Sequence, residues 1–121
     1  MKKENPTAKI TAKRLSMALA ERCMTQQMLA DLSDVSKSSI SQYVHARNIP
    51  SSDNARRMSA ILGVRPEWLM GFGDDDIENN MDGSWWAIQE LWKMISTEQR
   101  ETLVNTAIMF AKLNMEVDKK K

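Results

Sequence analysis

The chain has 121 residues, of which 42% are hydrophobic and 27% are charged, so it has room for one ordinary domain with an appendage. No apolar stretch approaches the roughly 18 residues that a membrane span needs, and the basic N-terminus lacks the apolar region of a secretory signal, so we expect a cytoplasmic protein. One cysteine (Cys23) and one histidine (His45) exclude an internal disulfide and a typical zinc site, and we expect neither a metal nor another cofactor.

Strand patterns are scarce, whereas helical patterns recur about every dozen residues. A first helix is predicted near residues 8–22. Pro50 and the polar residues 51–53 break the chain, and a further helix follows that ends at Gly63 in a left-handed conformation. A last short turn opens at residues 65–67, with a proline where a helix accepts one. The inward-facing side chains of these elements are expected to be Leu15, Ala18, Leu19, Ala55, Met58, Leu62, Trp68 and Leu69.

Between these elements, residues 25–43 have the pattern of two short helices joined by a sharp bend. Thr25 and Ser36 are each predicted to cap a helix by accepting a free backbone N–H. The turn at residues 33–35 is very short, and Asp34 can adopt the left-handed conformation that such a bend needs. The side chains expected between the two helices are Leu29, Ala30, Val35 and Ile40. This pattern is a helix-turn-helix.

Beyond this region the composition changes. Residues 71–83 contain three Gly and four Asp and show no helical stripe, and we predict an acidic linker at residues 73–83. Ser84 is predicted to cap a helix over residues 84–95.

A second C-terminal helix is predicted from the pair Ser96 and Gln99, which has the spacing of a capping box, to about residue 115. The two C-terminal helices carry more apolar surface than they can bury in each other. We therefore expect residues 84–116 to form a helical hairpin that pairs with a second copy of the chain. Capture of another protein, such as an antirepressor or a toxin, is the alternative. The residues expected at this contact are Trp85, Ile88, Trp92, Leu103, Ile108 and Phe110.

Charge is distributed unevenly along the chain. Up to Phe72 there are eleven Lys and Arg against six Asp and Glu, which gives +5. From Gly73 onward the balance is −4. The basic half is therefore the better partner for a polyanion, although two ordinary solvated surfaces could also differ this much. Arg56 and Arg57 are expected to be surface charges rather than phosphate contacts.

The second helix of the helix-turn-helix, predicted for residues 37–45, has a polar face without an acid. Lys37, Ser38, Ser41 and Gln42 share this face. Such side chains suit base edges in the major groove, because Gln can bond adenine twice and Lys can donate to guanine. A solvated helix of this composition would usually carry an acid there. We therefore expect this face to read DNA, with a merely solvated face as the simpler alternative.

These features together resemble the lambda-repressor-like helix-turn-helix family, of the phage repressor and Cro type. The matching residues are Thr25-Gln26…Leu29-Ala30, Val35-Ser36…Ile40-Ser41-Gln42-Tyr43, Pro50, Leu62-Gly63-Val64 and Trp68-Leu69-Met70-Gly71. The resemblance implies a five-helix DNA-binding domain over residues 8–72, and its ending is most like that of temperate-phage repressors. Two glycines common in the family are replaced here, by Asp34 in the turn and by Ala46 after the second helix.

The resemblance also implies which residues contact DNA. Gln26 would lie on a phosphate, Lys37, Ser38 and Gln42 on bases, and Arg47 or Asn48 near the backbone or flanking bases. Thr25, Ser36 and Ser41 complete the expected DNA-binding set.

From the sequence we predict an all-α, non-enzymatic repressor of phage or prophage type. It would bind operator DNA through residues 37–45, as a dimer or higher oligomer, at the nucleoid of a bacterial host. An antitoxin or a restriction–modification controller with the same fold is the alternative. An enzyme using Cys23 and His45 lacks a third orienting group. The 49 residues after Phe72 are too few and too helical for the self-cleaving peptidase domain of many such repressors, so induction is expected from a partner protein, a ligand or dilution.

Overall fold

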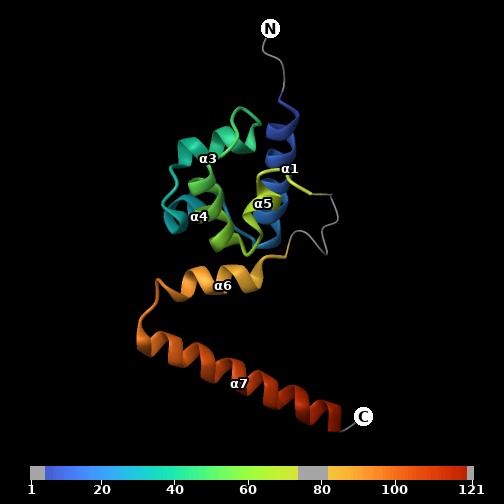
Figure 1. Cartoon of the computed structure of the whole chain (residues 1–121), viewed down its shortest axis with the longest axis vertical. Helices are drawn as coiled ribbons and strands as arrows, with labels where there is room; N and C mark the ends of the chain where they lie inside the picture. Colours follow the sequence, from blue (N-terminus) through green and yellow to red (C-terminus); the bar gives the residue numbers. More distant parts are fainter. Residues whose placement is uncertain (1–4, 74–81, 120–121) are drawn as a thin grey trace. The chain divides into compact units, whose positions relative to one another are not determined.

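The computed structural model describes residues 5–73 and 82–119, and the chain divides into two compact units, Met1–Glu90 and Leu91–Lys121. Within the described residues the regular elements are helices, which confirms the predicted all-α class (Figure 1). They are α1 (Pro6–Glu21), α2 (Gln26–Ser33), α3 (Lys37–Val44), α4 (Ser52–Leu62), α5 (Pro66–Leu69), α6 (Ser84–Trp92) and α7 (Thr97–Lys119).

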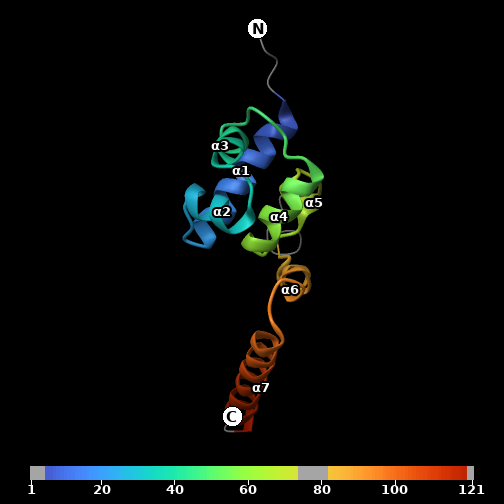
Figure 2. The same cartoon turned by 90° about the vertical axis from the view of Figure 1, so that its left-hand side faces the viewer.

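The first five helices surround one hydrophobic core. Helix α1 packs against α3 and α5, while α4 packs against α2 and α5 (Figures 1 and 2). The predicted inward-facing residues are buried, with Ala30 half-buried at the edge of the core. Full burial of a large aliphatic side chain contributes about 1.5–3 kcal/mol, so this set supplies most of the stability of the unit. The buried members are Leu15, Ala18, Leu19, Leu29, Val35, Ile40, Ala55, Met58, Leu62, Trp68 and Leu69.

The predicted caps of α2 and α3 are confirmed. The Thr25 hydroxyl accepts the backbone N–H of Met28 at 3.1 Å, and the Ser36 hydroxyl accepts that of Ser39 at 3.1 Å. Each cap satisfies one N–H that has no partner inside its helix. These two local contacts fix where both helices of the helix-turn-helix begin.

Two other helix starts differ from the prediction. Helix α1 begins at Pro6, two residues early, because Asn5 caps it by accepting the N–H of Thr7 at 2.9 Å and proline suits the first helical position. Helix α4 begins already at Ser52, because the Ser51 hydroxyl accepts the N–H of Asn54 at 3.1 Å. The predicted chain break therefore ends at Ser51.

A buried arginine joins α1 to the end of α5. Arg14 is only 2% exposed, and its guanidinium donates to the carbonyls of Trp68 (2.6 Å), Phe72 (2.8 Å) and Gly73 (2.9 Å). The guanidinium also lies over the Trp68 ring, 5.2 Å from its centroid. A buried charge needs such partners, and the end of a helix supplies carbonyl oxygens. Arg14 therefore belongs to the interior rather than to the basic surface.

The start of α6 packs onto the junction of α4 and α5. Gly83 donates its N–H to the Gly63 carbonyl at 3.0 Å, beside an isolated antiparallel bridge between Val64 and Asp82. A Cβ on Gly83 would lie 2.4 Å from the carbonyl carbon of Val64, so only glycine fits this approach. Residues 84–90 thus lie within the first unit. The predicted division into a domain, a linker at residues 73–83 and a C-terminal segment stays a prediction. Most of that predicted linker, residues 74–81, lies outside the described residues.

The predicted cap at Ser84 is wrong. Ser84 is the first residue of α6, and its N–H donates to the Asp82 carboxylate at 2.9 Å. Hydrogen bonds from the side chain and the backbone of Ser84 lower the pKa of Asp82 below its ordinary value, and the charges of Arg65 and Arg22 lower it further. The acid thus stabilises the positive end of the helix.

The capping box that begins α7 is confirmed. Gln99 donates its N–H to the Ser96 hydroxyl at 3.2 Å, and Ser96 donates its N–H to the Gln99 side-chain oxygen at 2.9 Å. Helix α6 ends at Trp92, three residues before the predicted end. Arg100 explains this end, because it donates to the Trp92 carbonyl at 2.9 Å and stacks 5.3 Å from the centre of its ring.

Candidate nucleic-acid interface

Helix α3 packs on the core with one face and exposes the opposite face to solvent. Ile40 and Tyr43 are buried, at 0% and 6% exposure. The four residues of the predicted polar face lie away from the core: Lys37 and Ser38 are exposed, and Ser41 and Gln42 are half-buried. No acid occurs in this helix, so its outward face combines positive charge with hydrogen-bonding groups.

The N-termini of α2 and α3 also lack acids. Neither helix carries Asp or Glu in its first turn. Helix N-termini carry partial positive charge and free N–H groups, and therefore attract phosphate. Gln26, half-buried, is the first residue of α2, while Thr25 and Ser36 are exposed and hold their caps. These ends remain open to an anion.

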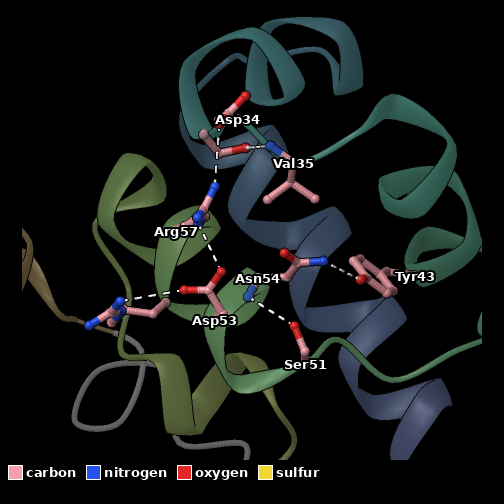
Figure 3. Close-up of polar contacts among 9 residues, drawn as sticks. Asp34, Val35, Tyr43, Ser51, Asp53, Asn54 and Arg57 are labelled. Atoms are coloured by element: carbon pink, nitrogen blue, oxygen red, sulfur yellow. Dashed lines mark hydrogen bonds and ion pairs between the residues drawn. The ribbon is translucent and has the colours of Figure 1, made fainter.

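Helix α4 braces α3 through a polar contact that the sequence did not reveal (Figure 3). The Asn54 side chain donates to the Tyr43 hydroxyl at 2.9 Å, while the Asn54 backbone N–H is held by Ser51. Tyr43 is therefore fixed at both ends, by the core and by α4. Ser51, three residues before Asn54, could have marked this helix start, but no local signal indicates the contact with Tyr43.

The turn before α3 is tied to the same helix. Arg57 lies between two acids, 3.4 Å from an Asp34 oxygen and 3.0 Å from an Asp53 oxygen (Figure 3). Arg56 lies 3.4 Å from an Asp53 oxygen. Such exposed pairs each contribute about 0–1 kcal/mol. Both arginines are surface charges, as predicted, and their partners within the first unit are acids.

The two positions at which the resembled family commonly has glycine, residues 34 and 46, have a left-handed backbone in this chain. Asp34 has φ +59° and Ala46 has φ +59°. For a residue with a side chain this conformation costs about 1–2 kcal/mol, although Asp adopts it more easily than Ala. After Ala46 the Arg47 N–H donates to the Gln42 carbonyl at 2.9 Å, which closes the end of α3. The loop that carries Arg47 and Asn48 is thus anchored on the helix.

The structure pairs two of the predicted DNA-binding side chains. The Asn48 side-chain amide donates to Oε1 of Gln42. His45 also turns back on the helix, its Nδ1 lying 2.7 Å from the Ser41 carbonyl oxygen. The sequence placed Gln42 and Asn48 in one set, but it did not show that they contact each other.

The residues predicted for self-association lie in both units. Trp85 (77% exposed) and Ile88 belong to the first unit, and Leu103, Ile108 and Phe110 of α7 are about half exposed. Trp92 is half-buried, with Arg100 over its ring. Leu103, Ile108 and Phe110 thus give α7 an exposed apolar surface.

Two other kinds of site are not found in the part of the chain that the structure describes. Over residues 5–73 and 82–119, no group of three His, Cys, Asp or Glu could hold a metal ion. None of the described helices is sufficiently long and apolar to traverse a bilayer.

Comparison with known proteins agrees with this geometry. Residues 12–69, a little under half of the chain, match a family described as Helix-turn-helix. Over this segment the chain is similar to helix-turn-helix domains of the lambda-repressor-like kind. Such domains bind double-stranded DNA, so the chain is a sequence-specific DNA-binding regulator. No curated protein and no solved structure gives a significant match.

Proposed function

We propose that the protein is a transcriptional repressor of phage or prophage type that places α3 in the major groove of operator DNA. The observation that carries this proposal is the acid-free outward face of α3, set on the core by Ile40 and Tyr43. A recognition helix must be held rigidly if its side chains are to meet base edges, and the contact from α4 supports that role. The protein would act in the bacterial cytoplasm.

The contacts divide into two kinds. Lys37, Ser38, Ser41 and Gln42 would meet bases from the outward face of α3. Gln26, Arg47 and the N–H groups that follow the caps Thr25 and Ser36 would hold phosphates, with Asn48 beside Gln42. Phosphate contacts give affinity without sequence preference, whereas base contacts give the preference.

The repressor would bind as a dimer or higher oligomer through its C-terminal helices. A single helix-turn-helix has a small footprint, and two copies would meet half-sites about 34 Å apart. The exposed apolar side chains of α7 support a second copy as the partner. The same helix also favours a second candidate, an antitoxin or restriction–modification controller, because it could hold a different protein such as a toxin or an antirepressor.

The first test is selection of bound fragments from random DNA, followed by titration of variants. Gln42→Ala should cost about 1–3 kcal/mol and relax the preference at one base pair. Arg47→Ala should weaken all sequences alike and lower the salt slope by about one. Arg56→Ala, which removes a partner of Asp53, is the control and should change little. Binding that ignores salt, or no selected sequence at all, would contradict the proposal.

The mass of the purified protein distinguishes a repressor that pairs with itself from an antitoxin that holds a toxin. A repressor that pairs with itself should have the mass of a dimer or larger in sedimentation, and half-sites should be selected at one spacing. An antitoxin that keeps α7 for a toxin should be a monomer until that partner is added.

A further inference from the structure

We propose that Gly83 is a positioning residue that sets the spacing between the two DNA half-sites that the protein selects. The inference rests on the proposed function, in which two copies paired through their C-terminal helices bind two half-sites. It goes further by assigning the control of their spacing to the place where the start of α6 is attached to the helix-turn-helix domain.

The start of α6 is held on the backbone between α4 and α5. The Gly83 N–H donates to the Gly63 carbonyl at 3.0 Å, and Asp82 forms an isolated antiparallel bridge with Val64. The Nε of Arg65 donates to the Asp82 carbonyl at 3.3 Å. Three consecutive residues of the domain thus restrain both the position and the direction of the chain as it enters α6. All of these contacts lie within the first unit.

This close approach is possible because residue 83 has no side chain. Gly83 is buried, and a Cβ there would lie 2.4 Å from the carbonyl carbon of Val64 and 2.6 Å from the nitrogen of Arg65. Both are backbone atoms, which cannot turn aside as the end of a side chain can. Ala87, four residues further along the same face of α6, is only 4% exposed. This face of α6 is therefore covered along its first turn.

The attachment leaves residues 74–81 outside the path that links α3 to α7. Before this segment, Arg14 donates to the Gly73 carbonyl at 2.9 Å, and after it Gly83 is bonded to Gly63. Both flanks are therefore held on the same domain. Helix α6 then continues from the first unit into the second. The length of residues 74–81 should consequently have no influence on the distance between two recognition helices.

A fixed attachment should make a pair of copies selective for spacing. Two recognition helices meet half-sites on one face of the DNA, and a shift of one half-site by about 5 bp, half a helical turn, moves it to the opposite face. A rigid pair cannot follow such a shift, whereas a loosely tethered pair can, because a flexible link tolerates many separations. Gly83 should therefore set the spacing preference although it has no side chain that could contact DNA.

The experiment uses the full-length protein and the half-site selected from random DNA. Titration gives the affinity for one half-site, for two at the selected spacing, and for two whose spacing is longer by about 5 bp. For the parent protein the longer spacing should lower the affinity about 10²-fold or more, as expected when a linked second site is lost. In Gly83→Ala this loss should be about tenfold smaller or less. The affinity for one half-site and the mass in sedimentation should stay those of the parent.

A second variant tests the same attachment by another route. Ala87→Glu places a long charged side chain at a buried position, so α6 should leave the domain and the spacing preference should relax as in Gly83→Ala. Gln89→Ala, an exposed change on the same helix, is the matched control and should keep the preference. A flexible insertion of about six Gly and Ser residues within residues 74–81 should also keep it.

The outcomes separate the inference from the function on which it rests. A spacing preference that persists in Gly83→Ala or in Ala87→Glu would overturn the inference. So would a relaxed preference in the insertion variant, because the spacing would then depend on the length of residues 74–81. If Gly83→Ala weakened binding to one half-site as much as to two, Gly83 would only support the fold, and the positioning role would be wrong. A parent protein that is a monomer, or that prefers no spacing, would instead contradict the pairing in the proposed function, and the inference with it.

Discussion

The helix-turn-helix domain buries its large apolar side chains, whereas α7 exposes its own. In the domain the large apolar residues of each helix meet in one core, and Leu15, Leu29 and Ile40 are completely buried. In α7 Leu103 is 44% exposed and Phe110 is 57% exposed. A helix that is apolar on many sides is normally buried, and a lone helix gains little stability in water. The first region thus buries its large apolar side chains within one chain, whereas those of α7 stay exposed.

The sharpest way to break this comparison is to make α7 polar. We expect Leu103→Asp with Phe110→Asp to give a monomer, because charges in a paired apolar surface remain without partners. Affinity for DNA with two half-sites should fall about 10²- to 10⁴-fold, the range expected when a linked second site is lost. Sedimentation and DNA titration measure the two effects. Asn105→Asp, an exposed polar change on the same helix, is the control. An unchanged mass would show that α7 does not hold a second copy.

The comparison also predicts that removing a large side chain lowers the free energy of unfolding in the domain but not in α7. Ile40→Ala should destabilise the domain by about 2–5 kcal/mol, because Ile40 has no exposed surface. Phe110→Ala should leave the unfolding free energy of the domain unchanged in dilute protein, where α7 has no partner. Denaturant unfolding followed by tryptophan fluorescence, to which buried Trp68 contributes, measures both. A large effect of Phe110→Ala under these conditions would mean that the two regions share one core.

The helix-turn-helix could be predicted from the sequence because its determinants are local. The caps at Thr25 and Ser36 and the apolar positions between them lie within twenty residues. Arg14 could not be placed in this way, since its carbonyl partners lie 54 to 59 residues further along the chain. Its position between Thr11 and Ala18, on the inward face of α1, was the only local sign of burial.

The cap of α6 and the contact between Gln42 and Asn48 were also not predicted, because both depend on contacts made by loops. Serine is a common capping residue, but here the Asp82 carboxylate accepts the N–H of Ser84. Asp82 is held in this position because the neighbouring Gly83 donates its N–H to the Gly63 carbonyl. The pairing of Gln42 with Asn48 likewise depends on the left-handed backbone between them, and alanine gave no sign of it. Local patterns therefore predicted elements well, whereas contacts made by loops required the fold.

A third prediction concerns the strained backbone of the domain. Ala46→Gly should stabilise the domain by about 1 kcal/mol, because glycine adopts φ +59° without the penalty that alanine has, less its larger entropy in the unfolded chain. Ala20→Gly is the matched control, since Ala20 is exposed within α1, and it should destabilise by about 0.5–1 kcal/mol. Thermal and denaturant unfolding measure both. Equal signs for the two variants would contradict the assignment of strain to residue 46.

The smallest effect is expected at Asp82, just before α6 begins. Its pKa lies below the ordinary 3.8 because Ser84 donates to the ionised carboxylate. A lowered pKa stabilises the folded state above the unfolded pKa, and this contribution is lost as the pH falls through the folded pKa. The attachment of α6 should therefore be insensitive to this group above about pH 5 and weaken only below pH 4. The Ser84 amide shift in NMR should titrate with a midpoint below 3.8, and Asp82→Asn should abolish that titration. A midpoint at or above 3.8 would mean that the carboxylate does not hold the start of α6, and the first unit would then end before it.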